Sequence, residues 1–423
     1  MPAVRPPDTT APRTGRFWVV FPCALLVLGW QVWTVVDRAP STFLLSYWFV
    51  TWDHGFLRRG LSGEINQWLF PGDLLVGAQI LRWAPAVVSA GCVAVVAVAL
   101  LRRGTPVTVG LGWLLIVSPF TVKALLVYTR PDQFAIVLLP LVALVWRWWP
   151  RRPTLPLLLL GLGFSTLVLI HEGIVLTVAP WLLLLIVHFS RGEGWRTTLG
   201  RVAALFSLPA LTTVVVLWRG RASPEQIEQL RANAPADVES GSTIFDNLGD
   251  SVVTSVRSVL SYGVDNLAAM VLVGLALWAV HLVALYCVPG LWRRPTRRVL
   301  LVLAGAVLPA LATELLIAID WQRWFALWLG LGLITYAVVL LAEPAAPPTA
   351  PQQWPRRTLA PFVVLCVLLT LVPVSTANNK LPCSVSFLVQ EAPQPFQRVV
   401  DAVTGRNGSD HHPKCSDDDW QWR

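Results

Sequence analysis

The sequence predicts an all-α fold, a polytopic bundle of about eleven membrane-spanning helices. The chain has 423 residues, of which 55% are hydrophobic and only 13% are charged. Soluble domains carry about twice that charged fraction. Apolar runs of about 20 residues recur along the chain, which is the length of helix that crosses the hydrocarbon core of a bilayer. Because helices satisfy their backbone polar groups internally, repeated runs of this length indicate a helical bundle.

The predicted spans are the apolar runs that recur along the chain. The first run begins at Phe17 and has no small-residue cleavage motif, so it predicts a retained helix and not a signal peptide. The pairs 107–149 and 154–189 each hold two short spans joined by a tight polar turn, and either pair could partly re-enter the membrane. The predicted spans are 17–36, 75–101, 107–122, 133–149, 154–170, 173–189, 202–218, 266–288, 299–318, 324–342 and 358–374.

The distribution of Lys and Arg predicts a cytoplasmic N-terminus and an external C-terminus. Segments assigned to the inside carry these residues at more than twice the density of the opposite side, as the positive-inside rule requires. The chain then divides into a cytoplasmic tail (1–16), a transmembrane bundle (17–374) with external loops 37–74 and 219–265, and an external tail (375–423). The net charge of +9 follows from this pattern and does not indicate nucleic acid as a partner.

Ionisable residues collect at the outer ends of the predicted spans. Such groups are costly at membrane depth unless they are paired or hydrated, so they are candidates for function. Acids and bases gathered on one face imply a shared water-accessible cavity. The alternative is a set of structural pairs: Asp132 with Arg130, Asp320 with Arg323, and Glu64 with Arg58 or Arg59. Outside the first loop, the residues at these outer ends are Lys123, Arg130, Asp132, His171, Glu172, Glu314, Asp320 and Arg323.

The first external loop contains the densest polar stretch, "YWFVTWDHGFLRRGLSGEI" (47–65). Glycines at 55, 60 and 63 are expected to break or bend the backbone. The adjacent Arg58 and Arg59 offer bidentate geometry for phosphate. Asp53 lies five residues earlier, so it could take a proton while nearby cations hold a phosphate leaving group. The alternative is an interfacial amphipathic segment, anchored among the headgroups by its tryptophans.

These residues resemble a known superfamily. An acidic residue in the first external loop, a basic stretch after it and about eleven spans are similar to the GT-C superfamily of integral membrane glycosyltransferases. The string "DHGFLRRGLSGEI" also resembles the D-x-GF-x-RRGL-x-G segment of poorly characterised bacterial multi-pass proteins of cell-surface polysaccharide pathways. The "HEG" turn at His171 and the D-x-x-RW stretch at Asp320 fit that group. Many GT-C members have a sizeable external C-terminal domain, whereas only about 49 residues follow the last predicted span here.

The resemblance implies an inverting transfer of sugar from a polyprenyl-phosphate donor to an envelope glycan or lipid acceptor. Asp53 would be the general base and the paired arginines would hold the lipid phosphate. No cofactor is predicted; a divalent cation could bind Asp53, Asp132, His171 and Glu172, but no ligand spacing predicts a metal site. The candidate substrate-binding residues are His54, Arg58, Arg59, Glu64, Lys123, Arg130, Asp132, His171, Glu172, Asp320 and Arg323.

Two further segments lie on the predicted external side. Loop 219–265 contains "SPEQ", in which Ser223 and Gln226 form a capping box with Pro224 at the first helical position, so a short helix is predicted. This loop is either a lid over the cavity or a plain connection. In the tail, Cys383 and Cys415 are predicted to form a disulfide, because an external compartment permits one.

Other functions compete with glycosyl transfer. A transporter or flippase for a lipid-linked glycan predicts charges near the bilayer midplane and interrupted helices. A polysaccharide polymerase would use a similar outer site, and a structural envelope subunit would need no catalysis. The excess of Arg over Lys and the abundance of Ala, Val, Leu and Pro suggest a GC-rich bacterium, with the protein in the cytoplasmic membrane.

Overall fold

The structure is a computed structural model. It describes residues 42–235, 238, 244–261, 264–289, 291, 297–317, 321–343 and 354–371, together with the single positions 22, 26 and 29. All regular structure in these ranges is helical, so the predicted all-α class is confirmed for them. The first predicted span (17–36) and the disulfide pair Cys383 and Cys415 fall outside the described residues, apart from those three positions.

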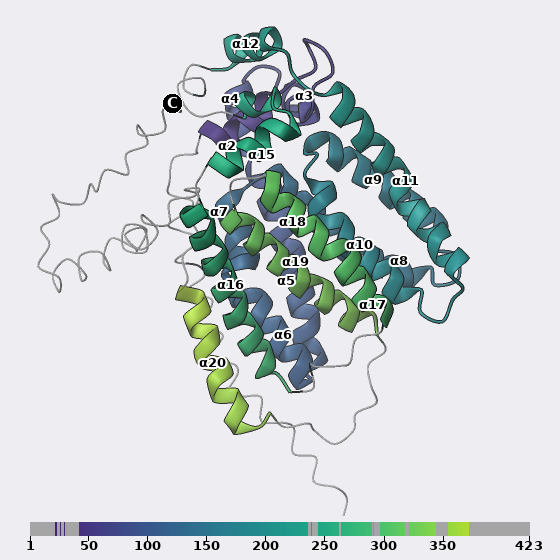
Figure 1. Cartoon of the computed structure of the whole chain (residues 1–423). Helices are drawn as coiled ribbons and strands as arrows, with labels where there is room; N and C mark the ends of the chain where they lie inside the picture. Colours follow the sequence, from purple (N-terminus) through teal and green to yellow (C-terminus); the bar gives the residue numbers. More distant parts are fainter. Residues whose placement is uncertain are drawn as a thin grey trace, which may run out of the picture.

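The first half of the chain forms two groups of helices (Figure 1). Short helices precede the bundle: α2 (Thr42–Ser46), η1 (Tyr47–Phe49), α3 (Gly60–Leu69) and α4 (Leu74–Leu81). The bundle helices that follow are α5 (Trp83–Arg103), α6 (Pro106–Val117), η2 (Pro119–Lys123), α7 (Ala124–Tyr128), η3 (Pro131–Val137), α8 (Leu138–Trp148), α9 (Thr154–Ile170), α10 (Ile174–Phe189) and α11 (Trp195–Arg219).

The second half repeats this order of short helices before long ones. The short helices are α12 (Pro224–Asn233), α14 (Phe245–Leu248) and α15 (Val252–Ser261). The bundle then continues with α16 (Val264–Tyr286), α17 (Arg297–Val302), η4 (Leu303–Val307), α18 (Leu308–Ile317), α19 (Trp321–Ala342) and α20 (Arg356–Leu371). The elements η2 and η4 are π-helical turns, a form often found at functional sites.

Helix α19 occupies the centre of the bundle. It packs against α5, α6, α8, α10, α16 and α18, and its buried Leu331, Ile334 and Val338 belong to the largest apolar core. On the periphery, α9 and α11 pack side by side along one edge (Figure 1). Their outward side chains Leu159 and Leu211 are more than half exposed. Apolar side chains that point away from the core fit a bundle surrounded by lipid.

Helices lie at the other ten predicted spans, but the count of eleven spans is not confirmed. Five helices are long and apolar enough to cross a membrane, or six if the bent pair Pro106–Val117 and Pro119–Leu126 is one span. Four more apolar helices are shorter, at 10–17 residues. The pair is bent by 43° because Pro119 follows Ser118, the residue that caps the end of α6, and Thr121 has non-helical backbone angles.

The short helices form a cap over one end of the bundle, seen at the top of Figure 1. The cap consists of α2, η1, α3, α12 and α14, with its own apolar core around Val50, Leu230 and Phe245. One half of the cap (α2, η1 and α3) comes from the first loop and the other half (α12 and α14) from the segment after α11. A backbone hydrogen bond also joins these two segments, since Arg58 N donates to Gly220 O at 2.8 Å. The predicted capping box is confirmed, with Ser223 and Gln226 closing the first turn of α12.

The glycines of the first loop act differently from the expected breaks. Gly55 has a φ of +112° and turns the chain, as expected. Gly63 lies inside α3, so the prediction of a break there is wrong, whereas Gly60 is the first residue of α3 and follows the left-handed Arg59, where the loop ends. Both glycines permit close packing, since a Cβ on Gly60 would lie 2.0 Å from Trp52 Nε1 and one on Gly63 would lie 2.1 Å from Val50 O.

Candidate functional site

An ion pair joins the cap to the bundle. Glu172 lies in the turn between α9 and α10, and Arg59 precedes α3. The guanidinium of Arg59 donates from Nε to Glu172 Oε2 at 2.9 Å and from Nη2 to Oε1 at 2.6 Å. Arg58 Nη1 lies 3.8 Å from the same Oε1. Arg59 has a left-handed φ of 66°, a conformation that a non-glycine residue keeps only when its surroundings hold it. The bidentate pair provides that restraint.

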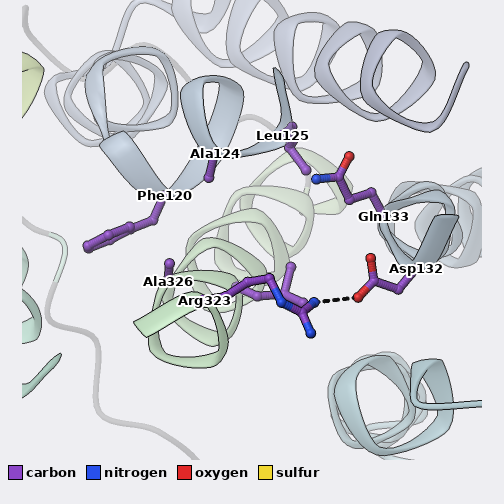
Figure 2. A pocket seen from close by; sticks show the side chains of 8 residues that line it. Phe120, Ala124, Leu125, Asp132, Gln133, Arg323 and Ala326 are labelled. Carbon is purple, nitrogen blue, oxygen red and sulfur yellow. Dashed lines mark hydrogen bonds and ion pairs between the residues drawn. The ribbon is translucent and has the colours of Figure 1, made fainter. Parts of the chain in front are cut away.

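A second ion pair joins η3 to α19. Arg323 Nη1 donates to Asp132 Oδ2 at 2.6 Å, and both side chains are buried. Figure 2 shows this bond beside a cavity that Phe120, Leu125 and Leu327 also line. The other carboxylate oxygen, Asp132 Oδ1, has no hydrogen-bond partner in the described part of the chain, and neither has Gln133 Oε1. The cavity measures about 20 Å³, which is room for one water molecule.

Aromatic rings link the first ion pair to Arg130, which lies two residues before Asp132. Tyr47 is only 1% exposed; its ring stacks on His171 at a centroid distance of 5.8 Å, and the guanidinium carbon of Arg59 lies 5.8 Å from its centroid. Arg130 lies over the ring of Phe43 at 5.1 Å, and Phe43 meets Tyr47 edge to face. Asp132 in turn interacts electrostatically with Arg130 and His171. Four arginines, two carboxylates and one histidine thus form a single group, called here the arginine cluster: Arg58, Arg59, Arg130, Asp132, His171, Glu172 and Arg323.

His171 is held neutral inside the arginine cluster. Gly173 N donates to His171 Nδ1 at 3.2 Å, so the ring proton lies on Nε2. Burial lowers the pKa of His171 to about 4, and the positive charge of Arg59 acts in the same direction. The imidazole is therefore a hydrogen-bonding group and not a cation at neutral pH.

The arginine cluster carries an excess of positive charge. Burial opposes ionisation of Glu172, but the charge of Arg59 outweighs it and holds the pKa of that carboxyl below its usual range. Both Glu172 and the buried Asp132 are then anions, each paired with an arginine. Among the described residues, four arginines thus face two carboxylates, and the arginines still outnumber the acids if the nearby Glu314 is counted as a third. An electropositive, largely desolvated group of arginines is suited to an anion, phosphate above all.

Three of the predicted site residues lie in the cap, outside the arginine cluster. Asp53 is exposed and accepts hydrogen bonds from Gln67 Nε2 at 2.7 Å and Thr51 Oγ1 at 3.0 Å. These two bonds lower the pKa of Asp53, so it is a carboxylate at neutral pH. Glu64 accepts a hydrogen bond from Trp52 N at 2.6 Å. The ring of His54 contacts Asn233 Nδ2 of α12 at 3.0 Å.

The structure corrects two expectations about these residues. Two of the three local pairings are wrong: Asp132 pairs with Arg323 and not with Arg130, and Glu64 pairs with neither Arg58 nor Arg59. The sequence predicted a shared water-accessible cavity, whereas the space that the described residues leave beside Asp132 measures about 20 Å³. Lys123 ends η2, but its side chain and the whole of Asp320 lie outside the described residues.

The described residues offer no preformed metal site. No group of three His, Cys, Asp or Glu side chains comes together among them. Asp132 and Glu172, two of the four residues considered as ligands, are each held by an arginine instead. Neutralisation of both carboxylates by guanidinium groups leaves little attraction for a divalent cation.

Sequence reasoning missed two residues of the site. Tyr47 is the first residue of the polar stretch, and in the sequence it resembles the other interfacial aromatic residues. Its stacking on His171 is seen only in the fold. Gln133 follows Asp132 directly and lines the same cavity. The sequence did contain a signal for Gln133, because it is an uncharged polar residue next to a buried acid, and such a residue is also costly to bury without a partner.

Comparison with known proteins places the chain in a family. The family model described as "Uncharacterised membrane protein Rv1490" matches residues 17–232, which is just over half of the chain. The chain belongs to this family. The matched range contains the whole of the first loop, the α9–α10 turn and α12. The Rv1490 family is one of membrane proteins, which agrees with the apolar bundle described above.

Full-length relatives come from mycobacteria. The uncharacterized protein Rv1490 of Mycobacterium tuberculosis (strain ATCC 25618 / H37Rv) is 26% identical over 411 residues, covering 87% of this chain and 92% of the relative. The uncharacterized protein Mb1527 of Mycobacterium bovis matches to the same extent. No solved structure matches.

Proposed function

We propose that this protein is a membrane glycosyltransferase that moves a sugar from a polyprenyl-phosphate donor to an envelope glycan or lipid acceptor, at the outer face of the cytoplasmic membrane. The observation that carries the proposal is the net positive charge of the arginine cluster at the cap end of an apolar bundle. A lipid-linked phosphate combines the two properties that this location selects, an anionic head and a hydrocarbon tail. The first-loop resemblance to GT-C enzymes supports the same class.

The lipid phosphate is assigned to Arg58 and Arg59. Both side chains are slightly exposed, at 15% and 13%, whereas Asp132 and Arg323 are more deeply buried. Arg58 Nε has no hydrogen-bond partner in the described part of the chain, so it keeps a donor for a ligand. A phosphate would compete with Glu172 for the two guanidinium groups. Because the cavity beside Asp132 holds only about one water molecule, a sugar enters it only if the elements that line it, η2, α7, η3 and α19, move apart.

Asp53 is assigned as the general base. Its carboxylate is ionised, exposed and held in place by Thr51 and Gln67, so an acceptor hydroxyl from the aqueous side can reach it. Its lowered pKa makes it a weak base, and proton transfer then depends on the leaving phosphate being held by arginine. Inverting transfer would proceed with the acceptor oxygen bonding to the anomeric carbon as the bond to the phosphate oxygen breaks.

A complementation experiment tests the assignment of Asp53. A strain lacking the gene is complemented with wild type, Asp53→Asn or Asp73→Asn, and the sugar composition of the envelope is measured at matched protein levels. Asp73 is the control because it is another exposed first-loop carboxylate, which caps α4 by accepting from Val76 N, and Asn caps helices equally well. Asp53→Asn should lose the glycan that Asp73→Asn restores. Full restoration by Asp53→Asn would exclude Asp53 as the base.

A binding experiment tests the arginine assignment separately. The purified protein in lipid nanodiscs is titrated with a polyprenyl phosphate and with the uncharged polyprenol. The proposal expects the phosphate to bind at least about tenfold more tightly, and Arg58→Met to remove about 1.5–3 kcal/mol of that preference, the usual contribution of a charge-assisted hydrogen bond. Equal affinity for the two lipids would reject a phosphate site.

A flippase for a lipid-linked glycan is the second candidate, favoured by the broken span at α6–α7. Buried Ser118 lies at this break and is 2.9 Å from Nε2 of the buried His281 on α16. Interrupted helices with polar groups at membrane depth are typical of transporters. In the complementation experiment a flippase would tolerate Asp53→Asn, and Ser118→Ala would then be the variant that reduces the glycan.

A further inference from the structure

A buried acid lies outside the arginine cluster and takes no part in the proposed transfer. Glu314 on α18 is 2% exposed. Its Oε1 is 2.7 Å from Thr177 Oγ1 on α10, and its Oε2 accepts a hydrogen bond from Trp328 Nε1 on α19. Three helices therefore build the surroundings of this one carboxyl group. No Lys, Arg or His side chain forms an ion pair with it among the described residues.

Counting protons at Thr177 limits the charge of Glu314. The hydroxyl has one hydrogen, but Oγ1 lies within hydrogen-bond distance of two oxygens, Glu314 Oε1 at 2.7 Å and Gly173 O at 2.9 Å. Gly173 O is a carbonyl and can only accept. If Thr177 donates to it, the hydrogen between Thr177 and Glu314 must come from the carboxyl group. If Glu314 were ionised, the hydroxyl oxygen would face one of its two neighbours with no hydrogen between them.

The cost of burial points the same way. A carboxylate removed from water without a paired cation is among the most expensive groups to place inside a protein, and such groups normally take up a proton. Asp132, buried in the same bundle, has a guanidinium at 2.6 Å. The neighbours of Glu314 are instead the neutral groups of Thr177 and Trp328, and the single hydroxyl hydrogen of Thr177 can also go to Gly173 O. The charged groups nearest to it on the adjoining elements are Arg323 on α19 and Asp132 on η3, and these neutralise each other.

We infer that Glu314 is a proton-binding site, held as the neutral carboxylic acid at neutral pH, which donates to Thr177 Oγ1 while Thr177 donates to Gly173 O. Gly173 also contacts the arginine cluster through its other peptide group, because Gly173 N donates to His171 Nδ1 at 3.2 Å. The proton-binding site and the arginine cluster therefore share one glycine as a neighbour. Protonation of Glu314 also preserves the positive charge of that cluster, which an ionised Glu314 would reduce.

Infrared spectroscopy on the full-length protein in nanodiscs tests the protonation state directly. At pH 7 the wild type should show a protonated-carboxyl stretch that Glu314→Gln removes. Thr177→Val takes away the acceptor of the proton, so it should shift this band to higher frequency. The control is Thr313→Val, which deletes an exposed hydroxyl on α18 bonded only to Pro309 O and should leave the band unchanged. If Glu314→Gln removes no protonated-carboxyl band, the acid is ionised and the inference is wrong.

Thermal unfolding of the same proteins provides a second, independent measurement. A neutral acid is closely matched by its amide, so Glu314→Gln should melt within about 2 °C of the wild type, whereas Glu314→Ala should melt several degrees lower because it leaves a cavity. A loss with Glu314→Gln as large as that with Glu314→Ala would contradict a neutral Glu314. Neither experiment needs a substrate, so the result is independent of the proposed transferase activity.

Discussion

The two ends of the bundle use arginine in different ways. At the cap end, Arg59 and Arg323 bind carboxylates that are 113 and 191 residues away in the chain. At the opposite end, Arg103 donates to the carbonyls of Leu340, Leu341 and Glu343, which end α19. Since α19 has 22 residues, these two sets of arginines lie about 30 Å apart.

The difference distinguishes a functional candidate from a structural one. The carbonyls at the end of a helix need donors, and Arg103 supplies them without burying any acid. Arg201, also at that end, meets the nearby Glu193 at 2.8 Å and Ser190 at 3.1 Å. The cap end instead buries opposite charges from distant helices, and in the part of the chain that the structure describes its arginines outnumber its carboxylates. Of the two ends, only the cap end therefore has an arrangement of arginines suited to binding an external anion.

Breaking the buried pair should have the largest effect. Arg323→Met leaves Asp132 buried without its cation, so it should lower the free energy of unfolding by about 3–5 kcal/mol. Chemical denaturation in detergent measures the loss. The double variant Asp132→Leu with Arg323→Met removes both charges and should recover most of the stability. A single variant as stable as wild type would mean that the pair contributes little to the fold.

The neutral histidine predicts how stability depends on pH. The folded pKa of His171 is about 4, against an ordinary value of 6.5. Between these values the unfolded chain binds a proton that the folded protein does not, so stability falls as the pH drops from 6.5 to 4, by up to about 3 kcal/mol. Phe can still stack on Tyr47 but cannot titrate. His171→Phe should therefore flatten the unfolding curve in this window, and an unchanged slope would assign the pH dependence to another group.

The smallest effect is expected at the opposite end. Arg103→Ala removes the donors to three carbonyls, which should cost about 1–2 kcal/mol. Arg102 is its neighbour, carries the same charge and is exposed, so Arg102→Ala should change stability by less than about 0.5 kcal/mol. Neither variant should alter the affinity for a polyprenyl phosphate. A loss of that affinity in Arg103→Ala would remove the distinction between the two ends.

The sequence predicted the composition of the site better than its geometry. Positive-inside counting and span assignment put Arg59, Asp132, His171, Glu172 and Arg323 at one end of the bundle, and the structure brings them together there. The ion-pair partners could not be predicted, because they depend on which helices pack against each other. Asp132 is two residues from Arg130 but bonds Arg323 on the central helix.

The positions of the helices could be predicted from the sequence, whereas the structure of the first loop could not. Length and hydropathy locate apolar helices, and the Ser-Pro-Glu-Gln pattern located the start of α12. In the first loop, Gly60 at the start of α3 and Gly63 inside it permit close packing, although local propensity predicts a break at Gly63. Contacts with Trp52 and Val50 decide this, and no single-sequence rule includes such tertiary contacts.

One amide side chain makes the two halves of the cap depend on each other. Gln226 Oε1 accepts from Ser223 N to complete the first turn of α12, while its Nε2 donates to the His54 carbonyl, 172 residues earlier, at 2.8 Å. A mutation that disrupts the first turn of α12 should therefore also remove the hydrogen bond that holds His54, the residue next to Asp53. Mutations that restore a damaged first loop should accordingly be sought in α12, although it lies about 170 residues further along the chain.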